Sequence, residues 1–149
     1  MGPLGRLSER HWKLIARLTP IPCVDVVVVK NSKILMGMRG IDPYRNVWAL
    51  PGGRVLKHEY PEETAKRVVR AIGLRVKKRS FVGVFPVKFP RHELKRYDIA
   101  LCYTSEWLAG EPRSDRELVR LSWFSPKKLP ARTGENYRKM IRKAFYENS

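Results

Sequence analysis

The stretch that most constrains the fold runs from Gly52 to Leu74 and reads GGRVLKHEYPEETAKRVVRAIGL. It follows VWALP, a short strand-like run, so a strand leads into two glycines that let the backbone turn and approach a ligand closely. Pro61 suits the first turn of a helix, and Glu62 and Glu63 lie favourably near the positive end of its dipole. The pattern therefore predicts a strand, a glycine turn and a helix over residues 60–72.

The remaining segments predict one α+β domain over residues 1–149. Alternating or β-branched runs are typical of strands, and helical spacing of apolar residues indicates a helix near each end. No linker divides the chain, and 43% hydrophobic residues suffice for a core. We expect a mixed β-sheet packed between helices, with a strand break at Pro86. The expected strands lie near residues 23–30, 33–39, 74–87, 97–107 and 117–126, and the outer helices near 9–18 and 133–147.

The chain is strongly basic: 31 Lys and Arg against 14 Asp and Glu give a formal net charge of +17. Such a surface attracts nucleotides, diphosphates and RNA, although it can also serve solubility or heat resistance alone. The longest apolar run, Val24–Val29, is too short to span a bilayer, and residues 1–12 lack the apolar segment of a signal peptide. We therefore expect a cytoplasmic protein without a membrane partner. Its two cysteines are expected to be free, buried thiols.

Within the Gly52–Leu74 stretch, the spacing of three residues resembles the Nudix box, G-x5-E-x7-R-E-U-x-E-E-x-G-U. Gly53, Glu59 and Arg67 match its first half. The second half departs from it: Val68 replaces the first glutamate, Ala71 replaces one of the glutamate pair, and a one-residue deletion removes the other. The resemblance implies a Nudix fold and hydrolysis of a diphosphate compound with Mg²⁺ or Mn²⁺. The departure implies that any metal site is weak, and it leaves open whether the chain is catalytically active.

A longer block, GMRGIDPYRNVWALPGGRVLKHE, resembles the GDP-mannose mannosyl hydrolase branch of that family. In that branch, glycosyl transfer to water replaces attack on phosphorus. Its members are commonly homodimers, so the resemblance also implies that this chain forms a homodimer. The resemblance implies that Asp25 contacts the nucleotide and that Arg39 and Arg54 bind the diphosphate. The branch's catalytic histidine is missing, because Glu117 and Leu118 stand near its expected position.

The candidate catalytic and metal-binding residues each have a second interpretation. For a divalent cation, the candidates are the Gly52 carbonyl, Glu59 and Glu117, although Glu59 can instead orient the loop that carries it. For proton transfer, they are Glu63, His92 and Glu117. Glu63 can equally serve the helix dipole, His92 can be a solvated loop residue, and Glu117 can pair with a neighbouring arginine.

Two functions remain open on the sequence. One is a Nudix-type hydrolase of a nucleoside diphosphate linked to another group, in particular a nucleotide sugar, working by metal-assisted hydrolysis. The other is a catalytically lapsed Nudix fold that binds nucleotide or RNA through its basic surface. The missing glutamates and histidine favour the second function, and the substrate-side arginines and aspartate favour the first.

Overall fold

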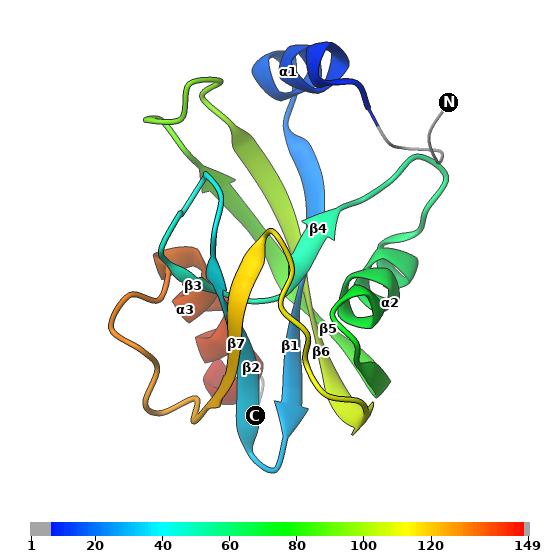
Figure 1. Cartoon of the computed structure of the whole chain (residues 1–149), viewed down its shortest axis with the longest axis vertical. Coiled ribbons are helices and arrows are strands. Elements are labelled where there is room, and N and C mark those ends of the chain that lie inside the picture. The colour runs from blue at the N-terminus through cyan, green and yellow to red at the C-terminus, as the bar shows by residue number, and fades with distance from the viewer. Residues whose placement is uncertain (1–6, 148–149) are drawn as a thin grey trace.

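The computed structural model of the chain describes residues 7–147. Within this range a mixed sheet of seven strands forms the centre, and helices lie on both of its faces (Figure 1). The expected α+β architecture is confirmed, while residues 1–6 of the N-terminal segment lie outside the described range. In chain order the elements are α1 (Glu9–Leu18), β1 (Ile21–Lys30), β2 (Lys33–Arg39), β3 (Trp48–Ala49), β4 (Gly52–Arg54), α2 (Pro61–Ala71), β5 (Arg75–Lys88), β6 (Tyr97–Ala109), β7 (Leu118–Phe124), α3 (Glu135–Arg142) and a final π-helical turn, η1 (Lys143–Glu147).

Strand β1 occupies the centre of the sheet, whose main path runs β3-β2-β1-β6-β5. It lies parallel to β6 along most of its length, with Ile21 opposite Asp98 and Asp25 opposite Cys102. The other strand pairs are antiparallel, with β4 joined to β1 and β7 joined to β2. Parallel neighbours need a long connection, which here contains β2 to β5 and α2.

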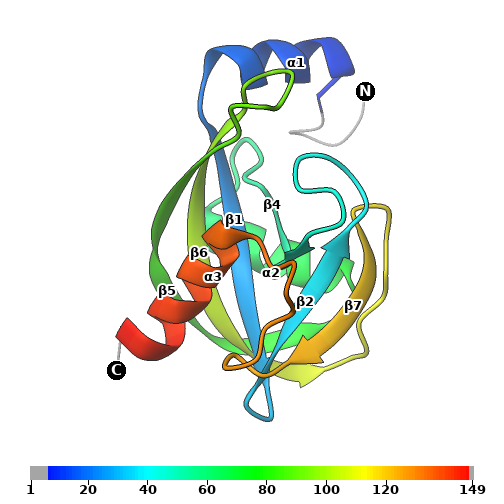
Figure 2. The ribbon, with the colours of Figure 1, turned by 90° about the vertical axis from the view of Figure 1, so that its left-hand side faces the viewer.

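The sheet divides where β1 changes its partner. β1 pairs with β2 only near the hairpin, where Val29 lies opposite Ile34. Further toward its N-terminal end β1 pairs with β4 instead, which places Asp25 opposite Gly52. Because β2 continues in a pairing with β7, the two parts of the sheet separate above the hairpin (Figure 2).

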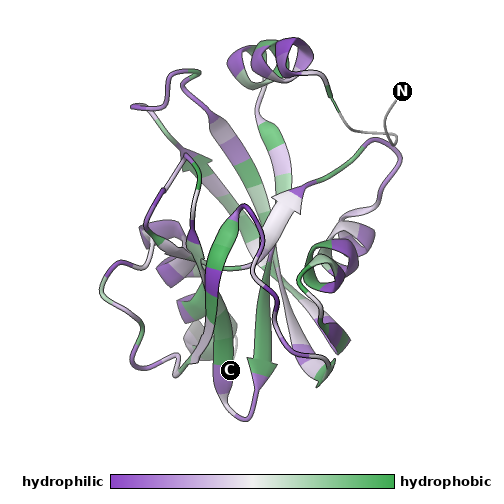
Figure 3. Cartoon of the chain, in the orientation of Figure 1, coloured by the Kyte–Doolittle hydropathy of each residue, from purple (hydrophilic) through white to green (hydrophobic). Residues whose placement is uncertain are grey.

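Each face of the sheet is covered by a helix with an apolar side. Successive strand residues point to opposite faces, so Val24, Val26 and Val28 pack with α2, while Val27 and Cys102 pack with α3. Apolar residues accordingly follow β1 and β2 (Figure 3). Burying one such aliphatic side chain contributes roughly 1.5–3 kcal/mol, so these two layers hold the sheet in place.

Helix α1 lies across one end of the sheet, apart from the two main layers (Figures 1 and 2). It begins after Ser8, whose hydroxyl accepts a hydrogen bond from the His11 amide at 3.2 Å. Ala16 is its buried residue, and it packs with Ile21 and Leu94, with Trp12 alongside. This small cluster fixes α1 beside the N-terminal end of β1.

Most predicted elements are confirmed, and two details differ. The helix expected over residues 60–72 is α2. The two glycines, however, do not form a turn: they belong to β4 and pair with β1. Pro86 does not break β5, because β5 is an edge strand, where a missing amide hydrogen is tolerated. None of the helices in the described range is long and apolar enough to cross a membrane.

Candidate functional site

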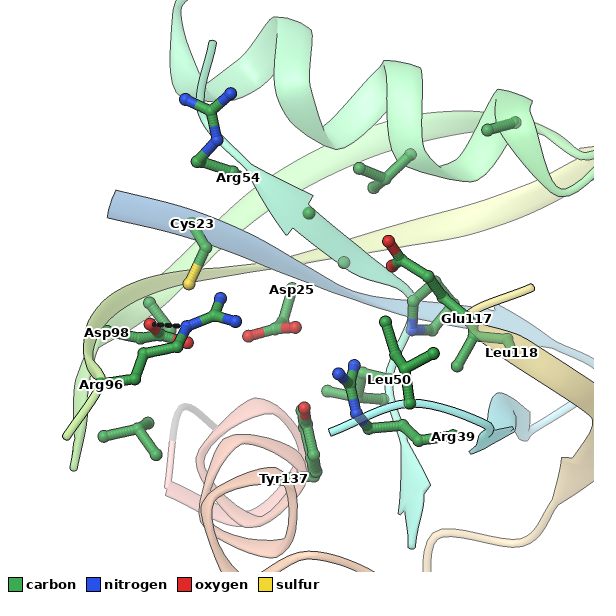
Figure 4. Close-up of a pocket in the computed structure, with 18 of the residues that line it drawn as sticks. Cys23, Asp25, Arg39, Leu50, Arg54, Arg96, Asp98, Glu117, Leu118 and Tyr137 are labelled. Carbon is green, nitrogen blue, oxygen red and sulfur yellow. Dashed lines mark hydrogen bonds and ion pairs between the residues drawn. The ribbon is translucent and has the colours of Figure 1, made fainter. Parts of the chain in front are cut away.

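A cavity of about 850 Å³ opens where β1 and β2 part. Cavities of roughly 300–1,000 Å³ commonly hold ligands of cofactor size. The lining comes from all three α-helices and from every strand except β3, together with the loops between them (Figure 4). It contains charged side chains of both signs: Arg39, Arg54, Arg67, Arg96, Asp25, Asp42, Asp98, Asp115 and Glu117.

Asp25 directs its carboxylate into this cavity (Figure 4). The residue is only 8% exposed, and within residues 7–147 its side chain has no hydrogen-bond or ion-pair partner. Gly52 lies opposite it on β4, and a Cβ at position 52 would collide with Oδ1 of Asp25. The absent side chain of Gly52 therefore allows the carboxylate to occupy this position.

The surroundings of Asp25 disfavour its charged form. Burial is the main cause, and the neighbouring Asp98 carboxylate adds to it, so that the pKa of Asp25 rises from 3.8 to about 7. Arg39 and Arg96 oppose the rise without cancelling it. A carboxyl group with this pKa can accept or donate a proton near neutral pH.

Asp98 and Arg96 extend the charged lining from β6 and the loop before it. Arg96 Nε donates a hydrogen bond to Asp98 Oδ1 at 2.7 Å. Because Asp98 lies opposite Ile21 on parallel β1, its side chain faces the same side of the sheet as that of Asp25. Neither residue is among the predicted site residues, because the β1–β6 pairing that brings them to Asp25 cannot be read from a local pattern.

The beginning of α3 closes another side of the cavity. Tyr137 is buried, and its hydroxyl points toward Asp25 and Arg39 (Figure 4). Burial raises the pKa of Tyr137, so its hydroxyl stays protonated and able to donate a hydrogen bond. Beside it, Oδ1 of Asn136 is buried and has no hydrogen-bond partner in the described part of the chain. These two residues add neutral polar groups to a largely charged site.

Glu59 is held by a complete set of hydrogen bonds at the entry to α2. Its carboxylate accepts from the Leu56 amide at 3.1 Å, from Thr64 Oγ1 at 2.7 Å and from Arg67 Nε at 2.8 Å. These contacts, with the Arg67 bond as the largest cause, lower the pKa of Glu59 to about 2. Arg67 also donates to the Arg54 carbonyl at 2.8 Å, so this cluster ties the loop and β4 to α2.

The α2 wall of the cavity is apolar where the Nudix box has its metal-binding glutamates. Val68, Ala71 and Ile72 line it, and a Cβ on Gly53 would lie 2.8 Å from Cγ1 of Val68. Residues 7–147 contain no group of three or more His, Cys, Asp or Glu side chains that could hold a metal ion. Because Mg²⁺ and Mn²⁺ prefer oxygen ligands, these residues do not fit a tightly held divalent cation.

Five of the eight predicted site residues line the cavity: Asp25, Arg39, Gly52, Arg54 and Glu117. The other three, which are Glu59, Glu63 and His92, lie outside its lining. Glu63 accepts a hydrogen bond from the Tyr60 amide at 2.9 Å and so caps α2. His92 Nδ1 accepts one from the Leu94 amide at 3.1 Å, within the loop between β5 and β6.

Trp12 of α1 lies at the cavity between two of its arginines. The guanidinium carbon of Arg96 is 5.2 Å from the centre of the indole ring, and that of Arg54 is 5.9 Å from it. These are cation–π distances, so the ring restrains both guanidinium groups. The amphipathic spacing of α1 in the sequence gave no sign of this role.

The comparisons with known proteins agree with the fold. The model of the NUDIX domain family matches residues 19–144. Agl8 of Haloferax volcanii, a low-salt glycan biosynthesis protein, is 32% identical over 84 residues, which make up 56% of this chain and 54% of Agl8. An ADP-ribose pyrophosphatase of Methanocaldococcus jannaschii is 29% identical over 114 residues, or 76% of this chain and 66% of that protein. The chain thus spans between half and two-thirds of these two relatives.

Solved structures show the same fold at low identity. A MutT NUDIX hydrolase from Burkholderia pseudomallei has a TM-score of 0.76 at 19% identity, covering 84% of this chain and 98% of that one. The NUDIX domain of Shewanella oneidensis NrtR, in complex with ADP ribose, has a TM-score of 0.70 at 17% identity, covering 96% of this chain and 100% of that one. Together with the Gly53, Glu59 and Arg67 spacing and the mixed sheet between helices, the match over residues 19–144 establishes that this chain belongs to the NUDIX domain family.

Proposed function

We propose that this chain binds a nucleoside diphosphate linked to a second group, in particular a nucleotide sugar, and hydrolyses it. The observation that carries the proposal is one cavity that combines several arginines with the buried carboxyl group of Asp25. Guanidinium groups suit diphosphate oxygens, because they offer forked hydrogen bonds with a fixed positive charge. In this reading Arg39 and Arg54 bind the diphosphate, and Asp25 contacts the rest of the substrate.

The names of the two relatives support this substrate class. ADP-ribose is a nucleoside diphosphate joined to a sugar, and one relative is an ADP-ribose pyrophosphatase. The other is a glycan biosynthesis protein. The identity of the base and of the sugar is part of the proposal and not of the family assignment.

The cavity offers groups for each requirement of the hydrolysis. Where the second group is a sugar joined through its anomeric carbon, water attacks that carbon, its bond to the diphosphate oxygen breaks, and the electron pair stays on that oxygen. In ADP-ribose, whose ribose is joined through its 5′ oxygen, water attacks a phosphorus atom instead, and the bond from that phosphorus to the bridging oxygen breaks with the electron pair left on the bridging oxygen. In this proposal Asp25 accepts the proton that the water loses, and the arginines stabilise the charge on the departing phosphate or diphosphate group. Glu117, on the loop before β7, is a second acidic candidate.

NUDIX hydrolases generally use divalent metals. Assistance by Mg²⁺ or Mn²⁺ through the Gly52 carbonyl and Glu117 therefore belongs to the proposal, as a weak site. Glu117 is exposed and the α2 wall offers no carboxylate, so none of the steps above depends on such an ion.

The test is turnover of ADP-ribose and a panel of nucleotide sugars, with Mg²⁺, with Mn²⁺ and with a chelator. Wild type is compared with Asp25→Asn, which keeps the shape of the side chain. Turnover above background that is lost in Asp25→Asn is the expected result. Equal turnover by both proteins would contradict the role of Asp25, and no turnover of any compound would contradict hydrolysis.

A second candidate function is ligand binding without turnover, and the apolar α2 wall is the observation that favours it. In this candidate the basic surface also binds RNA. One basic segment of that surface is exposed on β5: Arg75, Lys77, Lys78 and Arg79. RNA binding that weakens steeply with salt, in a protein without turnover, would support it.

A further inference from the structure

The part of the cavity wall at the C-terminal end of α2 carries no charged group that could neutralise a diphosphate or hold a cation. Val68 and Ile72 are buried apolar residues, and Ala71 offers only a methyl group. Glu59, the box glutamate that is present, already accepts hydrogen bonds from Leu56, Thr64 and Arg67. The Nudix-box positions that would hold a metal over the substrate are therefore either apolar or engaged elsewhere.

Four arginines line the same cavity, together with five acidic residues. Arg67 and Arg96 are paired with Glu59 and Asp98, so these two pairs are close to neutral. Arg39 has no carboxylate within ion-pair distance in residues 7–147, and its Nε is fixed by a hydrogen bond of 2.6 Å to the Pro43 carbonyl. Arg39 is thus a pre-oriented cation.

Arg54 is oriented from two sides. Its backbone carbonyl accepts a hydrogen bond from Arg67, which fixes the end of β4 to α2. Its guanidinium lies over the ring of Trp12, which also faces Arg96. Groups held in place before binding lose less conformational entropy when a ligand arrives. A diphosphate diester carries two negative charges, which the fixed cations Arg39 and Arg54 can balance.

We propose that the guanidinium groups of Arg39 and Arg54, held in place by Trp12 and the loops around them, replace a divalent cation in neutralising the bound diphosphate. This inference rests on the proposed ligand class. NUDIX hydrolases generally use divalent metals. The inference departs from this because the residues at the metal-binding positions of the box are apolar here and cannot coordinate a cation. Its consequence is that a nucleoside diphosphate diester binds without metal.

The test is calorimetric titration of the wild-type protein with ADP-ribose, first in excess chelator and then in millimolar Mg²⁺. The dissociation constants should agree within about threefold, because the α2 wall has no carboxylate where the Nudix box places its metal-binding glutamates. Binding that appears only with Mg²⁺, or that weakens about tenfold or more in chelator, would overturn the inference while leaving the proposed ligand class standing. If ADP-ribose binds in neither condition, the inference is overturned and ADP-ribose is excluded as a ligand.

One variant and one control test the part played by Arg54. Arg54→Gln should weaken binding in chelator about 10- to 100-fold, as expected for loss of a charged hydrogen-bond donor. Arg142→Gln, on the exposed side of α3 and outside the cavity, should leave binding unchanged. Equal affinities of both variants would contradict the role of Arg54, provided that their thermal unfolding matches that of wild type.

The test of Trp12 has to separate a role in holding the guanidinium groups from a role in packing α1. Trp12→Leu should weaken ADP-ribose binding by a smaller factor than Arg54→Gln, whereas Trp12→Phe should restore most of the loss, because a phenyl ring keeps a face for the guanidinium groups. If Trp12→Leu and Trp12→Phe bind equally, the ring serves only to pack α1, and its part in the inference fails.

Discussion

Glu59, at the entry to α2, and Asp25, on β1, are both shielded carboxylates, yet their surroundings act on them in opposite directions. Glu59 accepts hydrogen bonds from three partners, and its pKa falls to about 2. Asp25 has no such partner in the described residues, and its pKa rises to about 7. The first carboxylate therefore stabilises the folded chain, whereas the second opposes folding at neutral pH.

This difference separates structural from functional residues within the same family motif. The first half of the Nudix box is present because Glu59 and Arg67 fasten the loop to the helix, a task that needs no substrate. A buried carboxylate that receives no hydrogen bond has no such explanation. Its unfavourable position is understandable only if a ligand or a proton uses it, which is common at functional sites.

The largest expected effect is on turnover. Asp25→Asn should lower the rate of ADP-ribose or nucleotide-sugar hydrolysis by about 10²–10⁴-fold, the usual range for removal of a proton-transfer group. Steady-state kinetics of the two proteins measure it. A variant that retains more than about a tenth of wild-type activity would remove Asp25 from the chemistry.

The same variant should gain stability. The pKa of Asp25 is 3.8 in its ordinary state and about 7 in the fold, so the folded chain binds the extra proton between these values. Wild-type stability should therefore fall as pH rises from 4 to 7, by at most about 4 kcal/mol. Asp25→Asn removes this loss, and its free energy of unfolding at pH 8 should exceed that of wild type by about 1–4 kcal/mol. Denaturant unfolding measures this difference. If Asp25→Asn is less stable than wild type at pH 8, the charged Asp25 carboxylate does not destabilise the fold.

Glu59→Gln should lower the stability of the fold, and the change should be smaller than the gain expected for Asp25→Asn. Loss of its charged contacts should lower stability at pH 7 by about 1–3 kcal/mol, since Arg67 is partly exposed and can recover some hydration. Because the pKa of Glu59 is lowered, its contribution is present above 4.5 and disappears as pH falls toward 2. Denaturant unfolding at pH 7 and pH 3 should show the difference from wild type shrinking. The exposed Glu111→Gln is the matched control, and an equal loss there would count against the Glu59 cluster.

The sequence predicts the scaffold and the half of the site that one segment carries, but not the other half. Local spacing is enough for α2, for the hairpin at Asn31 and for Arg54 beside the two glycines. Asp98 and Arg96 reach Asp25 only through the parallel pairing of β1 with β6, a contact between distant segments that has no local pattern. Trp12 faces the cavity for a similar reason, because the place where α1 lies depends on its packing against Leu94 and Ile21.

The smallest expected effect concerns the apolar α2 wall, and it tests whether the missing carboxylates are what separates this cavity from a metal site. The double variant Val68→Glu with Ala71→Glu restores two carboxylates and should give Mg²⁺ a pair of ligands. Its affinity for ADP-ribose should then be about tenfold higher in Mg²⁺ than in chelator. Ala71 is exposed at the end of α2 and can accept the change at little cost. Val68 is buried against Gly53, so its replacement should lower stability, and Ala71→Glu alone provides a milder comparison.

Wild type should show no such Mg²⁺ dependence in the same titration. If the folded double variant also shows none, the loss of these two side chains is not what distinguishes this cavity, and the shortened end of α2 would have to be the cause.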